Sequence, residues 1–489
     1  MPALRPHDPT ALAGGGSGAT ALRPLLDTVL TALAEGAAER CGPLPAGGPT
    51  SRHARFGGTI LPALGTGAHE ALDTLVQALA RGAADPADPH CVAHLHCPPL
   101  AVATAADLAA SALNPSLDSW DQAPAASALE ARVTAELAAL VHPSGPAPDA
   151  LVTTGGTESN LLGVLLARER DPAPLRVCCG ANAHHSTARA TWLLGLPPPT
   201  VLPTPRGVLD PAAVRAAVEA LPPGAHALVV ATAGTTDTGA IDPLPALADL
   251  VAAQRRHRPA SLHIDAAYGG PLLLSPRHRD QLAGLERADT VTLDLHKLGW
   301  QPIAAGLLTV PDRAILLPLG YQADYLNADD DTEAGLPDLL GRSLRTTRRA
   351  DVLKIAVTLR ALGRAGLARL IEDTCAAARR LAELVLGAPG LRLHARPTIS
   401  TVLFRPAGAS DERVASVRRQ LLADGRAVLG RAWTEDERGR RTLWLKATLL
   451  NPGVQESDLA ALLKLVLEQA AEPGPPPHRP SAGSLTPRP

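Results

Sequence analysis

The middle of the chain alternates short β-like runs with helix-like runs, and this order constrains the fold more than any other feature. Strands are expected at 175–179, 227–231, 261–264, 290–293 and 306–310, and helices at 158–168, 211–220 and 245–256. A strand–helix–strand rhythm favours an α/β fold with a mostly parallel sheet and helices on both faces. Ligands of such sheets bind outside the carboxyl ends of the strands, so functional side chains are expected there.

The length and texture of the chain predict several domains. Its 489 residues suit two or three packed domains better than one small core. Residues 1–20, rich in Gly, Pro and Ala, and the Pro-rich residues 472–489 are predicted to be disordered. Between them we expect a helical segment at 21–100, a large domain at 101–345 and a small α+β domain at 346–471. The small domain is indicated by a helical stretch at 348–386, strands at 400–404 and 442–448, and a helix at 457–469.

Composition excludes several classes of partner. The chain carries 46 basic and 48 acidic residues, so its net charge of −2 indicates no nucleic-acid or membrane partner. Its six cysteines follow no disulfide framework, which favours a reducing compartment. Residues 1–20 lack a signal-peptide pattern, and no apolar run reaches the roughly 18 residues of a membrane span. The sequence therefore predicts a soluble, cytoplasmic protein.

The chain contains four lysines, and one of them stands at a strand end. Lys464 lies in an amphipathic helical run, Lys354 lies among arginines, and Lys446 lies in a strand-like run of the small domain. Lys297 ends the run DTVTLDLHK, where an apolar strand meets a loop. A covalently bound aldehyde cofactor needs such a lysine. Taken alone, however, Lys297 is more simply explained as a strand-end lysine in solvent.

A second strand end carries an acid. The string HIDAAYGG places Asp265 at the end of a strand that is expected to be buried, where an unpaired carboxylate is costly. The ring nitrogen of a pyridoxal cofactor would be its partner, and the small Ala267 would let the ring lie flat. The simpler alternative is a carboxylate that hydrogen-bonds to the backbone or to water.

Three polar loops complete a candidate cofactor site. TTGGTESN is a glycine turn that opens a helix, where the N–H groups of Gly156 and Thr157 would face a phosphate. AHHS offers His184 for stacking on a ring and Ser186 for a polar contact, and TAGTTDTGAIDPL offers Thr236. An ordinary capped helix, loop histidines and a turn explain each motif alone. Together with the lysine and the acid, they predict a pyridoxal-phosphate site.

The chain resembles the group II pyridoxal-phosphate decarboxylases, which have the aspartate-aminotransferase fold. The closest resemblance is to bacterial 2,4-diaminobutyrate decarboxylases and to siderophore-pathway lysine or ornithine decarboxylases. It covers residues 89–466 and is carried by the strings NPSLDSWDQAPAASALE, TTGGTESNLL, ATAGTTDTGAIDPLP, HIDAAYGG, ERADTVTLDLHK, ADYLN, RTTRRADVLK and LKATLLNP. The resemblance implies a fold type I large domain around a seven-stranded sheet. It also implies a homodimer with shared active sites, in which the segment 21–100 is a dimer arm.

The resemblance also assigns roles to residues of this chain. Lys297 would bind pyridoxal 5'-phosphate covalently, Asp265 would pair with the ring nitrogen, and His184 and Ala267 would pack on its two faces. The phosphate contacts would be Gly156, Thr157 and His296. The polar shell would be Ser186, Thr236 and Asp294. Two residues would act on the neighbouring subunit, namely Tyr325, a catalytic residue on a mobile loop, and Thr347, which would approach the phosphate.

These observations predict an enzyme that decarboxylates an L-amino acid to its amine and carbon dioxide. A basic substrate is expected, such as 2,4-diaminobutyrate, ornithine or lysine. The sequence does not identify the acceptor for its ammonium group, although Asp118 and Asp121 lie in one of the matching strings. Other chemistry on the same cofactor (aminotransferase, aldehyde-forming or lyase) and a catalytically inactive paralogue remain alternatives. A metal-binding protein is an alternative of a different class. It rests on Cys91, His94 and the neighbouring His96 and Cys97, whose spacing is not a standard zinc pattern.

Overall fold

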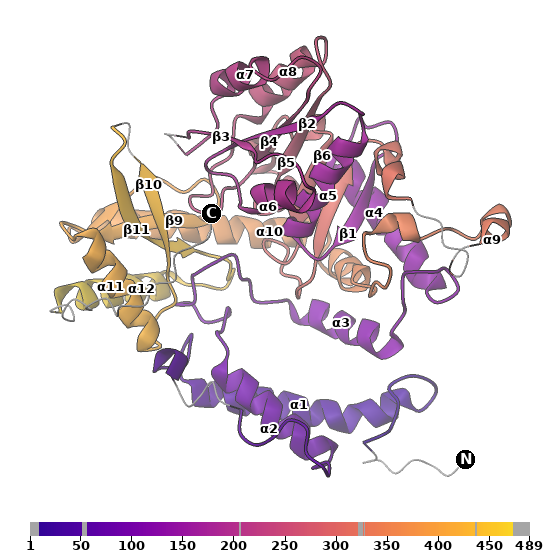
Figure 1. The fold of residues 1–489 in the computed structure, drawn as a ribbon. Helices are drawn as coiled ribbons and strands as arrows, with labels where there is room; N and C mark the ends of the chain where they lie inside the picture. Colours follow the sequence, from indigo (N-terminus) through magenta and orange to yellow (C-terminus); the bar gives the residue numbers. More distant parts are fainter. Residues whose placement is uncertain are drawn as a thin grey trace.

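A computed structural model describes residues 9–50, 56–204, 207–320, 326, 328–435 and 438–472. Figure 1 shows a body built around a large sheet, a smaller sheet domain beside it, and a pair of long helices below the body. The two helices of this pair are α1 (Gly18–Arg40) and α2 (Ala68–Gly82), and α3 (Ala101–Leu113) lies between them and the large sheet. None of the helices in these described ranges is long and apolar enough to cross a membrane.

The large sheet has seven strands, in the order β1-β7-β6-β5-β4-β2-β3. They are β1 (Asp149–Thr153), β2 (Leu175–Gly180), β3 (Thr200–Leu202), β4 (His226–Thr232), β5 (Ala260–Asp265), β6 (Thr290–Asp294) and β7 (Gly306–Val310). Within this sheet β7 is antiparallel to both of its neighbours, β1 and β6, and the pairs among β6, β5, β4, β2 and β3 are parallel. The predicted mostly parallel, seven-stranded α/β fold is therefore confirmed. The alternation did not predict β1 or the three-residue edge strand β3.

Both faces of the sheet are covered, which explains why its central strands β4, β5 and β6 are buried at every position. On one face, Val229 and Ile264 pack with α4 (Pro124–Val141), α7 (Pro211–Glu219), α8 (Leu244–Gln254) and the start of α10 (Val352–Gly387). On the other face, Leu228 and Val230 pack with α5 (Gly156–Glu169) and α6 (Ser186–Leu193). Alternate residues of β4 thus serve opposite cores, as the two-residue period of a strand requires.

The small domain is built on a second, separate sheet. Its antiparallel sheet has the order β10-β11-β9-β8, formed by β8 (Leu391–Leu393), β9 (Thr401–Pro406), β10 (Gly430–Glu435) and β11 (Arg441–Thr448). One face packs on α11 (Asp411–Ala423), α12 (Glu456–Ala471) and the second half of α10. The backbone of α10 is interrupted at Gly363, whose φ of 61° is left-handed.

Short elements complete the described chain. The only remaining α-helix of the described ranges is α9 (Asp329–Glu333). Single 3-10 turns occur at Gly48–Thr50, Gly270–Leu274, Arg279–Leu282, Leu285–Arg287, Arg313–Leu319 and Leu340–Arg342.

A buried ion pair fixes the start of α10 against α4. Nη1 of Arg348 donates to both carboxylate oxygens of Glu130 at 2.9 Å, and the two side chains are 2% and 5% exposed. Nε and Nη2 of Arg348 are buried without a hydrogen-bond partner in the described part of the chain. The Arg348 carbonyl also accepts from the Leu117 N–H at 2.8 Å. Among the described residues, Glu130 is therefore the one carboxylate that compensates this buried guanidinium.

We expect Glu130→Ala to lower the free energy of unfolding by about 3–5 kcal/mol, because it leaves the Arg348 charge buried and unpaired. The matched control is Glu136→Ala on the same helix, whose ion pair with Arg132 is 69% and 77% exposed. That change should cost at most about 1 kcal/mol. Denaturant unfolding of the two variants measures the difference, and equal losses would contradict the prediction.

Candidate functional site

A cavity of about 390 Å³ lies where the carboxyl ends of β4, β5 and β6 meet the first turn of α5. Nine of the residues that the sequence singled out line it: Gly156, Thr157, His184, Thr236, Asp265, Ala267, Asp294, His296 and Lys297. A wider cleft of about 1500 Å³ adjoins the cavity and shares His184 and Thr236 with it. The cleft lies between the large domain and the β10–β11 hairpin, so it forms an approach to the cavity.

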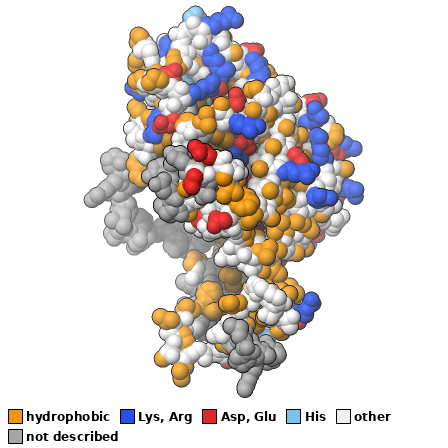
Figure 2. Space-filling model, turned by 90° about the vertical axis from the view of Figure 1, so that its right-hand side faces the viewer, with side chains coloured by type: hydrophobic (Ala, Val, Ile, Leu, Met, Phe, Trp, Pro, Cys, Tyr) orange, Lys and Arg blue, Asp and Glu red, His pale blue; other side chains and the backbone are white. Residues whose placement is uncertain are grey.

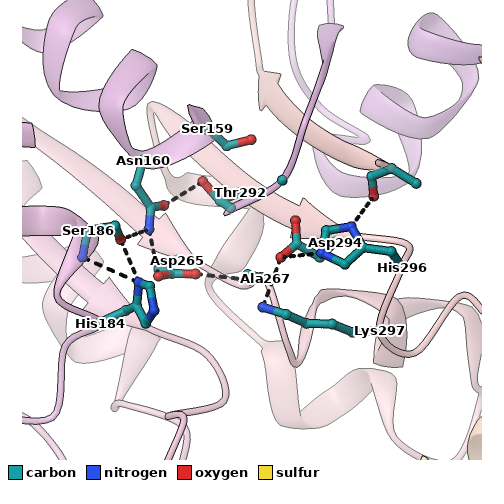
Figure 3. Close-up of polar contacts among 12 residues, drawn as sticks. Ser159, Asn160, His184, Ser186, Asp265, Ala267, Thr292, Asp294, His296 and Lys297 are labelled. Atoms are coloured by element: carbon teal, nitrogen blue, oxygen red, sulfur yellow. Dashed lines mark hydrogen bonds and ion pairs between the residues drawn. The ribbon is translucent and has the colours of Figure 1, made fainter. Parts of the chain in front are cut away.

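Lys297 reaches the cavity from the turn after β6. Its Nζ lies 2.8 Å from Oδ2 of Asp294, and the lysine side chain is 18% exposed (Figure 3). The other oxygen of Asp294 is buried without a hydrogen-bond partner in the described residues. His296 lies beside the same carboxylate, with Nε2 at 3.6 Å from Oδ2, while its Nδ1 lies 3.3 Å from the Ala305 carbonyl. Burial lowers the pKa of His296, and Asp294 opposes that effect.

Asp265 closes the neighbouring strand and is buried. Its Oδ1 accepts a hydrogen bond from the N–H of Ala267 at 3.1 Å, and its Oδ2 accepts from Nδ2 of Asn160 at 2.7 Å. Each carboxylate oxygen can accept a further bond. Asp265 also lines the cavity. The carboxylate is therefore held by protein donors and is still able to bind a protonated ring nitrogen.

His184 comes from the loop between β2 and α6. Its Nδ1 lies 2.8 Å from the Ser186 hydroxyl and 3.3 Å from the Ser186 N–H. Burial lowers the pKa of His184, and the nearby Asp265 carboxylate opposes that effect. Ser186 itself is buried behind the histidine and is not among the residues that line the cavity. The loop thus presents a neutral, half-buried imidazole to the cavity.

The turn before α5 is shaped for an anion. Gly155 has φ 149°, a conformation essentially limited to glycine, and it cannot cap α5 with a side chain. A Cβ on Gly155 would lie 3.0 Å from Cε1 of His296, and one on Gly156 would lie 3.0 Å from Cβ of Ala267. The first N–H groups of this 14-residue helix therefore stay open toward the cavity, where the helix dipole favours a phosphate.

These features fit pyridoxal phosphate. The cavity combines a lysine amine, a buried carboxylate, an imidazole and an uncapped helix N-terminus. Those four groups are the partners of the aldehyde, the ring nitrogen, the ring face and the phosphate. No other charged cluster is needed to complete the match.

The structure does not place every predicted residue at this cavity. Tyr325 falls outside the described residues. Thr347 is exposed and does not line the cavity. Both were expected to act on a neighbouring subunit. Asp118 and Asp121 do not line it either.

Sequence reasoning missed three buried residues. Asn160 connects Asp265 to Ser186, and His263 bonds to Asn160. Their spacing was a usable signal, because Asn160 lies one helical turn after Gly156 and His263 lies two strand positions before Asp265. Lys446 also lines the cavity, with Nζ at 3.0 Å from the Thr236 carbonyl. No local pattern identified it, because it comes from the small domain.

The segment on which the metal-binding alternative rests, residues 91–97 of the described chain, does not gather its cysteines and histidines into a metal-binding cluster. His94 lines the cavity, whereas Cys97 is buried and its thiol donates to the His296 carbonyl at 3.2 Å. Burial raises the pKa of Cys91 and of Cys97 to about 12. In the part of the chain that the structure describes, no group of three or more His, Cys, Asp or Glu side chains is placed to hold a metal.

Comparison with known proteins gives consistent matches. The pyridoxal-dependent decarboxylase conserved domain matches residues 68–407. The chain is 41% identical over 429 residues to an L-2,4-diaminobutyrate decarboxylase of Rhizobium meliloti, covering 84% of both chains. It is 35% identical to one of Acinetobacter baumannii, covering 78% of this chain and 80% of the relative.

Solved structures match over nearly the whole chain. The glutamate decarboxylase domain of the diaminobutyrate-pyruvate transaminase and L-2,4-diaminobutyrate decarboxylase of Vibrio parahaemolyticus has a TM-score of 0.80 at 28% identity. That match covers 94% of this chain and 98% of the other. Mouse CSAD in apo form has a TM-score of 0.81 at 25% identity, covering 92% and 99%.

We expect Gly155→Ala to weaken binding of pyridoxal phosphate at least about tenfold, because one lost hydrogen bond to a charged group is worth 1.5–3 kcal/mol. The added Cβ would press on His296 and displace the turn that opens α5. Gly224→Ala is the control, since Gly224 also has a positive φ, of 75°, but no atom lies within 4 Å of an added Cβ. A cofactor titration followed by absorbance should show a loss for Gly155→Ala alone.

Proposed function

The chain belongs to the pyridoxal-dependent decarboxylase family, and from this premise we propose that its substrate is L-2,4-diaminobutyrate. It is a pyridoxal-phosphate-dependent amino-acid decarboxylase, which releases an amine and carbon dioxide. The observation that carries the proposed substrate is the 41% identity to a diaminobutyrate decarboxylase over 84% of both chains. The proposed products are propane-1,3-diamine and carbon dioxide.

We propose that the cavity residues hold the cofactor in the roles that the resemblance assigns. Lys297 carries it covalently, and the open N–H groups of Gly156 and Thr157, with His296, bind its phosphate. Asp265 binds the protonated ring nitrogen, while His184 and Ala267 pack on the ring. The placement of these side chains around one cavity supports the assignment. Thr236 and Asp294 belong to the same wall.

When bound, pyridoxal phosphate supplies a ring that accepts the electrons of the broken Cα–carboxylate bond. Asp265 keeps a proton on the ring nitrogen, because a buried carboxylate strongly favours a cationic partner. Asp294, 2.8 Å from Nζ of Lys297, holds the lysine ammonium in the cavity. The half-buried imidazole of His184 limits the access of water to that side of the cavity.

Lys446 is proposed to bind the substrate carboxylate before it leaves. Its Nζ is held at 2.9 Å from Oδ1 of Asp237 and 3.0 Å from the Thr236 carbonyl, and the residue is 8% exposed. An ammonium group has three donors, so one remains for a substrate oxygen. Lys446→Met should therefore raise KM for the amino acid.

We propose that the enzyme works as a homodimer whose arm is the α1–α2 pair. Large apolar side chains are exposed on it, among them Leu30 at 65% and Leu79 at 61%. Leu113 on the facing α3 is 74% exposed. Figure 2 shows this pair as a narrow lobe below the body, with hydrophobic side chains on it and on the adjoining face. Such surfaces are typical of protein interfaces.

A cytoplasmic location is part of the same proposal. All six cysteines are free thiols, and four of them, Cys97, Cys178, Cys179 and Cys375, are buried. Free thiols of this kind persist in reducing compartments.

We expect Lys297→Ala to abolish carbon dioxide release from L-2,4-diaminobutyrate, because no amine remains to carry the cofactor. Release should be compared with ornithine, lysine, glutamate and an aromatic amino acid, and the product should be assayed as amine or aldehyde. Lys464→Ala, at a 77% exposed position, should keep full activity. Preference for another amino acid would overturn the proposed substrate, and aldehyde as the main product would favour the aldehyde-forming alternative.

We expect light scattering to give a mass about twice the 50.4 kDa of one chain. Leu79→Asp should shift the population toward monomer, because it places a charge in an apolar interface. Leu386→Asp, at a position 54% exposed on α10, should leave the mass unchanged. A monomeric unmodified protein with full activity would contradict the shared active site.

A further inference from the structure

A buried hydrogen-bond network surrounds Asn160, and every polar atom of its side chain is used. Nδ2 donates to Oδ2 of Asp265 at 2.7 Å and to the Ser186 hydroxyl at 2.8 Å. Oδ1 accepts from the Thr292 hydroxyl at 2.8 Å and faces Nε2 of His263 at 3.0 Å. Asn160 is 1% exposed, and Figure 3 shows it between Asp265, Ser186 and Thr292. The amide therefore joins α5 to the ends of β5 and β6 and to the loop that carries His184.

The Asp265 carboxylate determines which way this amide points. A carboxylate oxygen only accepts hydrogen bonds, so the group 2.7 Å away must be the N–H side of the amide. The amide oxygen then faces His263, whose Nε2 must carry a proton. Burial lowers the pKa of His263 to about 4, so the ring is neutral and its Nδ1 accepts from the Thr290 hydroxyl at 2.8 Å. One proton arrangement therefore satisfies all of these atoms.

A second branch runs from Asn160 to His184. Because the Ser186 oxygen accepts from Asn160, its own hydrogen is free to bond to Nδ1 of His184 at 2.8 Å. The Ser186 N–H, at 3.3 Å from the same nitrogen, can only donate. Nδ1 of His184 is thus an acceptor, and the proton of the neutral ring lies on Nε2. Asn160 is therefore linked to both Asp265 and, through Ser186, the His184 ring of the candidate cofactor site.

The packing of α5 keeps this network in place. A Cβ on Gly163, one turn after Asn160, would lie only 2.5 Å from Nδ1 of His263. The helix can approach β5 closely only because that position is glycine. Thr292 is fully buried and His263 is 1% exposed. Water is therefore a poor substitute for any lost partner here.

We propose that Asn160 is a positioning residue, which holds the Asp265 carboxylate and, through Ser186, the His184 ring in the orientations that the cofactor requires. The inference rests on the cofactor-binding roles proposed above for Asp265 and His184. The titratable groups around these two residues are His263 on the same strand, His185 beside His184, and Lys297 with Asp294 at the end of β6. Asn160 is the uncharged side chain that connects Asp265 to His263 and, through Ser186, to His184.

Asn160→Leu, which keeps the size but removes the donor, should weaken cofactor binding about tenfold to a hundredfold, since a hydrogen bond to a charged group is worth 1.5–3 kcal/mol. The pH dependence of cofactor affinity should also differ from that of the unmodified enzyme, because Asn160 contacts the Asp265 carboxylate directly. Both quantities come from cofactor titrations by absorbance between pH 5 and 9.

Histidine variants provide the second measurement, in case Asn160→Leu does not fold. His263→Gln can still donate to the amide oxygen and should retain most of the affinity, whereas His263→Leu should lose it. His142→Leu is the matched control. His142 is also buried, and its Nε2 lies 3.0 Å from the hydroxyl of Thr309, a threonine on β7. It should lower the melting temperature of the cofactor-free protein without changing cofactor affinity.

The outcomes separate the inference from the proposed role of Asp265. Asp265→Asn should itself weaken binding and alter the pH dependence, and no effect of that change would refute the role of Asp265. If Asp265→Asn has its effect but Asn160→Leu binds the cofactor with unchanged affinity and pH dependence, the positioning role of Asn160 is wrong. Equal affinities of His263→Gln and His263→Leu would overturn it as well.

Discussion

The rest of the site depends on one constraint, which is that the Asp265 carboxylate is buried at the end of β5 and needs hydrogen-bond donors. The backbone supplies one, from Ala267, and Asn160 supplies the other. An ionised carboxylate in such a place is costly unless it is paired. The donors reduce that cost while one side of the carboxylate stays open to the cavity. In the proposed role of Asp265, burial strengthens the attraction of its carboxylate for a cationic ring nitrogen.

Close packing also determines the geometry where α5 meets the strands of the large sheet. Gly155 opens α5 with a conformation essentially limited to glycine, and Gly163 lets that helix touch His263. Both positions exclude a Cβ for reasons of contact, so the helix lies close enough to direct its N–H groups and Asn160 into one cavity. Lys297 and Asp294 approach from the end of β6. The parallel sheet brings these elements to one edge.

Much of this site could be predicted because its residues follow strand ends in short local strings. The positions of Lys297 and Asp265 follow from an apolar run that stops at a polar residue, and the glycine turn before α5 is visible in TTGGTESN. The helix bounds were harder to predict from the sequence. The edge strand β3 was missed because a strand of three residues carries no usable period. Thr347 was expected to act on a neighbouring subunit, and in this chain it is exposed and does not line the cavity.

The sequence by itself determined the fold class and the cofactor, and it singled out Lys297 as the lysine proposed to carry that cofactor, because each depends on local patterns with their own physical meaning. Only the tertiary structure decided which buried groups support them. Asn160 and Asp265 are 105 positions apart, and Lys446 and Thr236 are 210 positions apart. The local spacing can place Asn160 on the same helix face as Gly156, but it does not show which residue a hundred or more positions away becomes its partner. These long-range contacts exist because the packing of α5 on β5, and of the small domain on the large one, removes water from the groups that must then pair.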